Sequence, residues 1–413
     1  MRPVAILWRT CQGGPTRMGV PVAQRLQRIP PYPFREVAML KKQLVAEGKH
    51  IYDFGIGDPD MPTPRFVIDA LYEAAQDPAT HQYDESGYGI QEYKQAIADF
   101  AKDRFGVDVN PDGEIQSCIG SKEALAHIVW SYVDPGDVVL VPDPAYSVYK
   151  VQTMWCGGAP FPMPLDPQRG FLPDLEAIPL GVRRQAKLLF LNYPNNPTGA
   201  VATREFLAEA VEFAHKWGLI ICHDAAYCEV AYDGFEPPSI LEIDGAKQVA
   251  IEFHSFSKTF NMTGWRVGWA MGGKEIIEAL SRTKSNVDSG TFMAIQRAAI
   301  AALAHYREWI PGLRAEYQRR RDALVDGLRS LGWPVEPPKA TFYVWTPVAR
   351  GYTSIEFSKT LLEQAGVLTI AGSAYGDYGE GYVRWSLTIQ AADKLGTIQA
   401  AVGAIREKLR LSW

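Results

Sequence analysis

Residues 253–268 read FHSFSKTFNMTGWRVG, and they follow a run of residues with strand propensity. The stretch supplies two hydroxyls, Ser255 and Ser257, then the lysine Lys258, and then Arg266. Hydroxyls and a guanidinium are hydrogen-bond donors suited to a phosphate. Lys258 lies among aromatic and small residues, where desolvation and a neighbouring cation lower the pKa of an amine and expose a nucleophile. A phosphate-bearing cofactor that forms a Schiff base requires such an amine beside an anion pocket.

The length and composition of the chain limit the classes of protein it can belong to. With 413 residues it is longer than one hydrophobic core usually serves, so two domains are expected. A formal net charge of -5 offers no basic field for nucleic acid and no polybasic surface for a membrane. No run approaches the roughly 20 apolar residues of a membrane span. The 5 cysteines form no Cys-x-x-Cys pair, which favours a cytoplasmic location over a disulfide framework.

Strands alternate with helices from Ile51 to about Ala304, which predicts an α/β domain with a mostly parallel central sheet flanked by helices. A smaller α+β domain is expected from the N- and C-terminal segments. We expect an N-terminal segment at 18–50 that packs with the small domain, a large cofactor-binding domain at 51–309, and the small domain at 310–413.

Several helix boundaries are predicted from local signals. An amphipathic helix is expected over 35–48. Its apolar face would be formed by Val37, Leu40, Leu44 and Val45. Thr63 and Pro64 form an N-cap and N1 pair that predicts the start of another helix. A long helix is expected to begin at Pro311.

Polar residues follow three strands of the expected parallel sheet. They are Asn196, Asp224 and Lys258. Ligands bind beyond the carboxyl ends of such strands, so these side chains are expected to converge. Asp224 ends a continuous apolar strand, where a carboxylate is costly unless it meets a cation. An interior aspartate satisfied by backbone donors is the alternative.

Two further stretches are typical of ligand-binding loops. Ser121 and Lys122 open a helix whose first turn directs unpaired N–H groups and a positive dipole end at an anion such as phosphate. A serine N-cap with nothing bound is the alternative. The glycine turn at 55–60 contains Gly57. It is not a dinucleotide fingerprint, because its last position is Asp60 and no helix opens there.

Taken together, these motifs resemble the fold-type I pyridoxal-phosphate-dependent aminotransferases (class I/II) over about 31–401. The Ser-x-Ser-Lys motif at 255–258 and the Gly-x-Arg-x-Gly motif at 264–268 match the cofactor-lysine motif of that family. Asn-Pro-Thr-Gly at 196–199 matches another family motif. The resemblance implies pyridoxal 5'-phosphate as cofactor, amino acids and 2-oxo acids as substrates, and ping-pong transamination.

The resemblance also implies roles for individual residues. Lys258 would carry the cofactor and then move the α-proton of the substrate as general acid and base. Asp224 would keep the ring nitrogen of the cofactor protonated. Tyr227 and Asn196 would bond the ring hydroxyl, next to the substrate. Arg384 would bind the substrate α-carboxylate in a bidentate pair.

Tyr146 would stack on the pyridine ring, and the backbone of Gly57 would approach the substrate carboxylate. The cofactor phosphate would be held by Ser121, Lys122, Ser255, Ser257 and Arg266. Tyr83 would reach the cofactor phosphate of a neighbouring subunit, which implies a homodimer with composite active sites. The local spacing leaves Tyr88 open as an alternative.

Residues 257–265 and 286–292 are most similar to LL-diaminopimelate aminotransferases and their alanine- and glutamate-using relatives. No arginine matches the one that aspartate aminotransferases bring from the neighbouring subunit, but Arg282 and Lys284 are near, so aspartate stays open. Pyridoxal-phosphate lyases acting at Cβ or Cγ share the fold and also stay open. Transcription regulators on this fold carry a DNA-binding domain, for which the segment before the resemblance is too short.

The 7 histidines show no ligand spacing, so no catalytic metal is expected. The chain has neither a Walker loop nor a G-x-S-x-G elbow. The family resemblance begins near Pro30, and Met18 is a typical start. Residues before Met18 are therefore expected to be an upstream extension.

Overall fold

The computed structural model describes residues 20–29, 35–84 and 86–413. The strands in chain order are β1 (Tyr52–Asp53), β2 (Ile115–Cys118), β3 (Val138–Asp143), β4 (Ala159–Asp166), β5 (Leu172–Pro173), β6 (Ala186–Asn192), β7 (Ile220–Asp224), β8 (Ala250–Ser255), β9 (Gly268–Gly272), β10 (Tyr343–Pro347), β11 (Val367–Leu368), β12 (Ile370–Ala371) and β13 (Tyr382–Ser386). The helices are α1 (Gln24–Arg28), α2 (Arg35–Ala46), α3 (Arg65–Ala74), α4 (Gln91–Phe105), α5 (Ser121–Tyr132), α6 (Val148–Trp155), α7 (Leu180–Arg183), α8 (Arg204–Trp217), α9 (Phe256–Thr259), α10 (Lys274–Lys284), α11 (Met293–Ala304), α12 (Tyr306–Arg329), α13 (Ser354–Ala365) and α14 (Lys394–Lys408).

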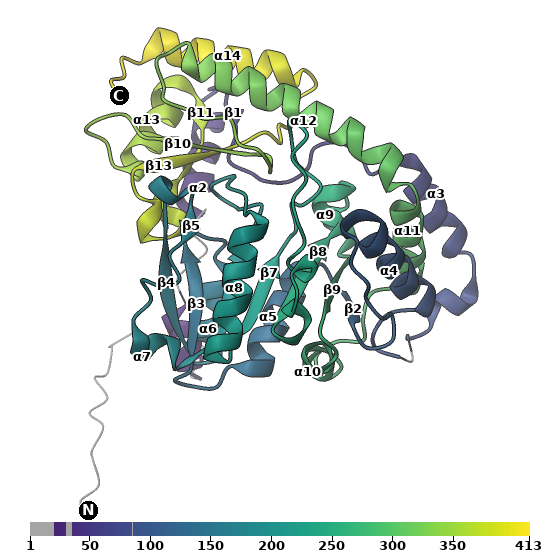
Figure 1. Ribbon diagram of the computed structural model, residues 1–413. Coiled ribbons are helices and arrows are strands. Elements are labelled where there is room, and N and C mark those ends of the chain that lie inside the picture. The colour runs from purple at the N-terminus through teal and green to yellow at the C-terminus, as the bar shows by residue number, and fades with distance from the viewer. Residues whose placement is uncertain (1–19, 30–34, 85) are drawn as a thin grey trace, which may run out of the picture.

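An eight-stranded sheet forms the centre of the molecule, in the order β2-β9-β8-β7-β6-β3-β4-β5 (Figure 1). The five strands β8, β7, β6, β3 and β4 pair in parallel, while β9, β2 and β5 join antiparallel at the two edges. The predicted α/β class with a mostly parallel central sheet is confirmed.

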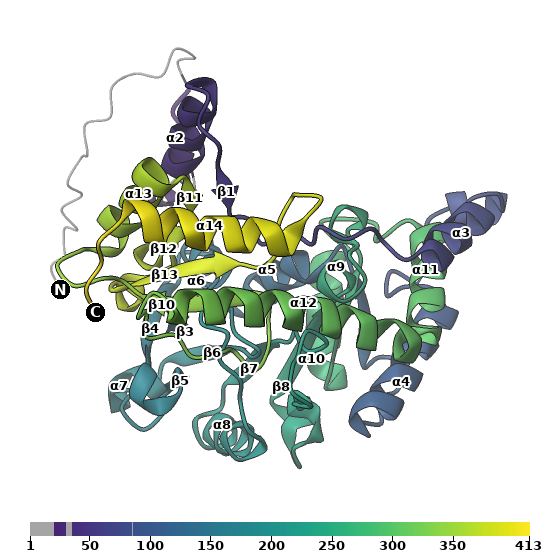
Figure 2. The same cartoon turned by 90° about the horizontal axis from the view of Figure 1, so that it is seen from above.

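Strand β6 illustrates why this sheet needs helices on both sides. Its residues are apolar on both faces: Leu188 and Phe190 join the core cluster of α5, α6 and α10, whereas Leu189 and Leu191 join the cluster that contains α8. Figure 2 shows α8 on the opposite side of the sheet from α5 and α6. A strand buried on both faces carries such a continuous apolar run.

The C-terminal part of the chain builds two small sheets above the central one (Figure 1). Strands β10, β13 and β12 form an antiparallel sheet, and β1, which comes just after the expected N-terminal segment 18–50, pairs in parallel with β11. Leu44 of that segment packs against Leu362 and Leu368, so both the segment and β1 contact the C-terminal part. The expected boundary between 309 and 310 falls inside α12, and the division into domains stays a prediction.

Two predicted helix starts are wrong. The long helix α12 begins at Tyr306, and Pro311 lies inside it. Tyr306 and Ile310 are buried, so packing outweighs the preference of proline for the first turn. The N-cap of α3 is Pro64 without a side-chain cap bond. The Thr63 hydroxyl instead donates to the Asn261 carbonyl oxygen at 2.9 Å.

The apolar face expected on the first long helix is only partly formed by α2. Leu44 is buried and Leu40 packs against its small cluster, but Val45 is 53% exposed. Val45 was therefore wrongly assigned to this face, because it lies beside the stripe that contacts the C-terminal part. The side chain of Val37 and the segment before Met18 lie outside the described residues.

A buried ion pair ties α12 to the glycine turn at 55–60. Arg320 Nη1 lies 2.8 Å from Asp60 Oδ1, and neither side chain is exposed. Lys394 Nζ lies 3.1 Å from the other oxygen of the same carboxylate. Arg320 also donates to the Leu387 carbonyl oxygen at 3.0 Å. Arg320 Nε also lies 2.8 Å from Glu316 Oε1, so each charge of the pair has a second partner of opposite sign.

Among the described residues, no helix combines the length and the apolar character that crossing a bilayer demands.

The central sheet predicts a clear contrast between two leucines. Leu189 in β6 is fully buried, so Leu189→Ala should lower the free energy of unfolding by roughly 2–5 kcal/mol through the cavity it leaves. Leu180 in α7 is 51% exposed, so Leu180→Ala should change stability by no more than about 0.5 kcal/mol. Urea unfolding of both variants measures the difference, and equal midpoints would contradict the assigned core.

Candidate active site

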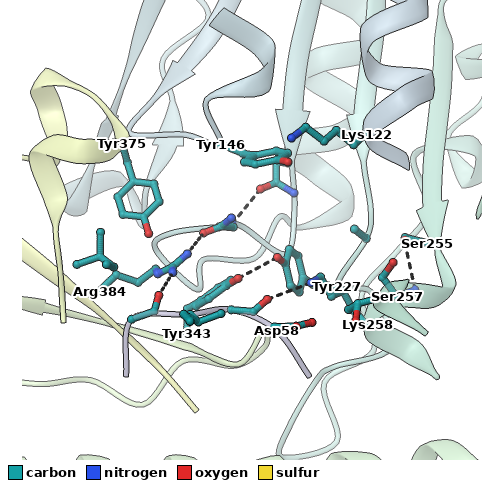
Figure 3. A pocket seen from close by; sticks show the side chains of 18 of the residues that line it. Asp58, Lys122, Tyr146, Tyr227, Ser255, Ser257, Lys258, Tyr343, Tyr375 and Arg384 are labelled. Carbon is teal, nitrogen blue, oxygen red and sulfur yellow. Dashed lines mark hydrogen bonds between the residues drawn. The ribbon is translucent and has the colours of Figure 1, made fainter. Parts of the chain in front are cut away.

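A cavity of about 880 Å³ lies at the carboxyl ends of the parallel strands, between the central sheet and the C-terminal part (Figure 3). The glycine turn at 55–60 also contributes to its wall. The predicted site residues that line it are Gly57, Ser121, Lys122, Tyr146, Asn196, Asp224, Tyr227, Ser255, Ser257, Lys258, Arg266 and Arg384. Of the predicted set, Tyr83 alone does not line this cavity.

The register of the strands sets the floor of the cavity. Asn192 at the end of β6 pairs with Asp224 at the end of β7, and Asp224 pairs with Phe253 in β8. Asn192 Nδ2 donates to the Asp224 carbonyl oxygen at 2.8 Å. Its side-chain oxygen accepts from the Asn196 N–H at 2.9 Å. The loop that carries Asn196 is therefore fastened to the strand end that carries Asp224.

Asp224 is a buried carboxylate with both a side-chain and a backbone donor. The Tyr149 hydroxyl donates to Asp224 Oδ2 at 2.7 Å, and the Ala226 N–H donates to Oδ1 at 3.3 Å. Burial raises the pKa of Asp224 above its ordinary value, while the Tyr149 hydrogen bond opposes that shift. Tyr149 was missed at the sequence level. It is buried in α6 and stacks on Phe190 with ring centroids 4.7 Å apart.

The Lys258 amine points into the cavity from α9, the short helix that follows β8. Its Nζ donates to the Gly57 carbonyl oxygen at 3.1 Å. Burial lowers the pKa of Lys258 to about 8. Asp58 raises this pKa, whereas the guanidiniums of Arg384 and Arg266 lower it. About a tenth of this amine is therefore neutral at pH 7, compared with far less than a hundredth of an ordinary lysine, and the neutral form is the nucleophile.

A polar cradle forms one end of the cavity. Helix α5 begins at Ser121, so its first N–H groups face this end. Arg266 has a left-handed φ of 55°, which costs a non-glycine residue of order 1–3 kcal/mol. Its guanidinium donates to the Thr263 carbonyl oxygen at 2.8 Å and to the Ile119 carbonyl oxygen at 3.3 Å. These two hydrogen bonds keep this cation beside the helix N-terminus, in spite of the strained backbone.

Gly120 shows how closely that cradle is packed. Its φ is 72°, and a Cβ at this position would overlap the guanidinium of Arg266. Ser255 lies opposite, and its hydroxyl accepts from the Ser257 N–H at 3.2 Å. A larger residue in place of Gly120 would displace the arginine from the cradle.

Arg384 projects from β13 into the other end of the cavity and is 4% exposed. Its Nη1 donates to Asn196 Oδ1 at 3.0 Å, and its Nη2 donates to the Gly55 carbonyl oxygen at 2.7 Å. The guanidinium carbon lies 4.1 Å from the ring centroid of Tyr343 and 5.0 Å from that of Tyr375. These contacts fix the plane in which the guanidinium can meet a carboxylate.

Tyr227 and Tyr343 meet in the middle of the cavity wall. Their hydroxyl oxygens are 3.2 Å apart, and both side chains are buried. Burial, reinforced by Tyr343, raises the pKa of Tyr227 well above its ordinary value. A Cβ on Gly57 would overlap the Tyr343 hydroxyl, so the backbone at position 57 can approach this tyrosine only because the residue is glycine. Tyr343 and Asp58, which also lines the cavity, were not predicted from the sequence.

Tyr83 is 79% exposed, and Tyr88 is half-buried against the cluster of α5 and α6. The structure of one chain therefore does not bring Tyr83 to its own cavity.

One group in the described ranges has atoms close enough to hold a metal ion: Glu123, His127 and Asp288. Lys284 is buried beside it, with Nζ 2.7 Å from Asp288 and 3.3 Å from Glu123. The Lys284 ammonium thus already compensates the charges of Glu123 and Asp288. None of the three residues of this group lines the cavity.

The donor set of the cavity fits pyridoxal 5'-phosphate. The cradle around Ser121, Ser255 and Arg266 offers N–H, O–H and guanidinium donors for a phosphate. Lys258 offers an amine with a lowered pKa, and Asp224 offers a buried carboxylate for a ring nitrogen. No metal is needed to complete this set.

Comparison with known proteins agrees with this geometry. The family model for aminotransferase class I and II matches residues 49–405. An LL-diaminopimelate aminotransferase of Moorella thermoacetica is 54% identical over 367 residues, which cover 89% of this chain and 94% of the relative. One of Desulforudis audaxviator is 52% identical, covering 89% and 93%.

Solved structures show the same likeness in three dimensions. Substrate-bound BacF from Bacillus subtilis superposes with a TM-score of 0.90 at 37% identity, covering 95% of this chain and 98% of that one. A probable N-succinyldiaminopimelate aminotransferase from Thermus thermophilus gives 0.86 at 35% identity, covering 91% and 100%. This chain belongs to the class I and II aminotransferases and is a pyridoxal-phosphate-dependent transaminase.

Proposed function

We propose that this enzyme transfers an amino group from LL-diaminopimelate to a 2-oxo acid by ping-pong chemistry. The observation that carries the proposal is the 50–54% identity to relatives of that name over about nine-tenths of the chain. The cavity supports it, because its wall carries charges of both signs: Asp58, and Lys41 with Asp53, whose Nζ and Oδ2 atoms lie 2.5 Å apart in an ion pair. A diamino dicarboxylic acid carries a second ammonium and a second carboxylate, which such a wall suits better than an apolar one.

The proposed chemistry centres on Lys258. When bound, pyridoxal phosphate supplies the carbon that takes up the amino group and the ring that delocalises electrons. The neutral amine of Lys258 would hold the cofactor as a nucleophile. Lys258 Nζ would also remove the proton from the substrate Cα as general base and return it as general acid.

The other residues orient and tune this site. Asp224, held by Tyr149, keeps a proton on the ring nitrogen, and Tyr227 with Asn196 bonds the ring hydroxyl. Arg384 binds the α-carboxylate of the substrate and fixes which Cα bond stands perpendicular to the ring.

The remaining contacts would hold the cofactor in place. Tyr146 stacks on the pyridine ring, and the backbone of Gly57 lies over the substrate carboxylate. The phosphate is anchored by Ser121, Lys122, Ser255, Ser257 and Arg266.

We further infer a cytoplasmic homodimer with composite active sites. Tyr83 is 79% exposed, and further large apolar side chains are exposed on α3 and around the start of α11. They are Ile68, Tyr72, Val287 and Phe292. Helices α3 and α11 pack together, so these side chains share one region of the surface. A second copy of the chain would cover them and would bring its Tyr83 to this cavity.

The donor is tested by adding single amino acids to the purified enzyme and following the visible absorption of its cofactor. Diaminopimelate should bleach the band to that of the pyridoxamine form, and a 2-oxo acid should restore it. The panel contains alanine, glutamate, aspartate and aromatic amino acids as competitors. If only one of these amino acids bleaches the band, that amino acid replaces diaminopimelate as the proposed donor. A band that persists while ammonia or sulfide is released would indicate a lyase.

The lowered pKa of Lys258 predicts how attachment of the cofactor depends on pH. Below its pKa the amine is mostly protonated and cannot attack, so the attachment rate should rise with pH, reach half its plateau near pH 8 and level off roughly one unit above. Stopped-flow absorbance of cofactor-free enzyme mixed with pyridoxal phosphate measures this rate. Lys258→Ala should neither develop the band nor turn over substrate. A rate that keeps rising to pH of about 10 would show an ordinary lysine.

The composite site predicts different effects for two neighbouring tyrosines. Tyr83→Phe should weaken cofactor binding roughly 10- to 100-fold, as expected for the loss of one hydrogen bond to a charged group. Tyr88→Phe serves as the matched control and should bind the cofactor normally. Equilibrium titration of both variants gives the dissociation constants, and sedimentation gives their mass. The reverse pattern would move the role to Tyr88, and a monomeric active enzyme would refute the composite site.

A further inference from the structure

Tyr343 opens β10 and connects the two ends of the cavity described above. Its side chain is 2% exposed, and Figure 3 shows it beside both Tyr227 and Arg384. Its hydroxyl oxygen lies 3.2 Å from that of Tyr227, and its ring faces the guanidinium of Arg384 at 4.1 Å. One buried side chain therefore contacts the residue proposed for the cofactor ring oxygen and the residue proposed for the substrate carboxylate.

The hydrogen bond between the two tyrosines has two possible directions, because each hydroxyl carries one hydrogen. When Tyr227 donates its hydroxyl hydrogen to the ring oxygen of the cofactor, it cannot also donate that hydrogen to the Tyr343 hydroxyl. The bond can then form only if Tyr343 donates and the Tyr227 oxygen accepts. Among the described residues, Tyr227 is the only hydrogen-bond partner of the Tyr343 hydroxyl, so no other acceptor in that part of the chain competes for its hydrogen.

We propose that Tyr343 is a positioning residue that fixes the direction of this relay, from Tyr343 through Tyr227 to the ring oxygen of the cofactor. The inference rests on the proposed contact between Tyr227 and that oxygen. A hydroxyl that accepts a hydrogen bond becomes a stronger donor. Tyr343 thus strengthens the donation by Tyr227 and stabilises negative charge on the ring oxygen.

Gly57 and Thr341 hold the Tyr343 side chain in its place. The Thr341 hydroxyl accepts from the Tyr343 N–H at 3.0 Å. On the other side, the Tyr343 hydroxyl fills the space where a Cβ on residue 57 would lie. The absent side chain of Gly57 is therefore what allows the hydroxyl to reach Tyr227.

The relay has a consequence that can be measured on the bound cofactor without turnover. Negative charge on the ring oxygen attracts the proton on the nitrogen that joins Lys258 to the cofactor. Stronger donation to the oxygen weakens that attraction and lowers the pKa of the nitrogen. The colour of the cofactor changes when this nitrogen titrates, so its pKa is the midpoint of the visible band in a pH titration.

The test is a pH titration of the visible band in the cofactor-loaded enzyme, its Tyr343→Phe variant and two reference variants. Tyr343→Phe keeps the ring and should raise the midpoint by roughly 0.3–1 pH unit. Tyr227→Phe should raise it further. Tyr317→Phe is the matched control: Tyr317 is buried against Phe342, and its hydroxyl has no hydrogen-bond partner among the described residues. Its midpoint should equal that of the unaltered enzyme.

The outcomes separate this inference from the function on which it rests. A shift in Tyr227→Phe without one in Tyr343→Phe overturns the relay. If Tyr227→Phe leaves the midpoint unchanged, the proposed contact between Tyr227 and the ring oxygen is itself wrong. Equal shifts in Tyr343→Phe and Tyr317→Phe assign the effect to packing and also overturn the relay. If Tyr343→Phe does not fold, 3-fluorotyrosine placed at this position is a stronger donor and should lower the midpoint, while an unchanged or raised midpoint contradicts the proposal.

The ring of Tyr343 supplies a second, independent readout. Since Tyr343→Phe retains the ring that faces Arg384, the KM for the amino donor should change less than about twofold. Tyr343→Leu removes both ring and hydroxyl, so it should raise KM as well as the midpoint of the visible band. If KM for the amino donor rises equally in Tyr343→Phe and Tyr343→Leu, the hydroxyl of Tyr343 does not act separately from its ring.

Discussion

The parallel pairing of β6, β7 and β8 in one register is the constraint on which the active site depends. It sets Asn192, Asp224 and Phe253 level with one another at the carboxyl edge of the sheet. Side chains alternate along a strand, so a slip of one residue would turn Asp224 to the opposite face. The side chains of β6 pack into a different core cluster on each face, so a slip would disrupt the packing on both sides. The packing of the core thus determines where the Asp224 carboxylate points.

Buried charged groups surround the same cavity, and each of them forms hydrogen bonds with neutral groups. Asp224 relies on a tyrosine and one backbone N–H. Arg384 donates to the neutral oxygens of Asn196 and Gly55. Lys258 donates to a neutral carbonyl oxygen. The neutral partners of Asp224 orient this carboxylate and leave its negative charge to attract a cation such as a protonated ring nitrogen.

Much of the fold was predictable from the sequence, because strand and helix periodicities and the motif around Lys258 are local signals. Twelve residues expected at the site do line one cavity. Tyr149 and Tyr343 were not predictable, because they come from α6 and β10 and meet Asp224 and Tyr227 only through tertiary packing. The start of α12 was misjudged for a similar reason, since buried side chains before its proline outweigh local preference.

The ion pair between Arg320 and Asp60 bears on how the cavity opens. Both side chains are excluded from water, so dissolved salt does not screen their attraction as it screens a surface pair. The turn that carries Gly55 and Gly57 cannot lift away alone unless this buried pair breaks. The pair therefore couples the position of the turn, at the wall of the cavity, to that of α12.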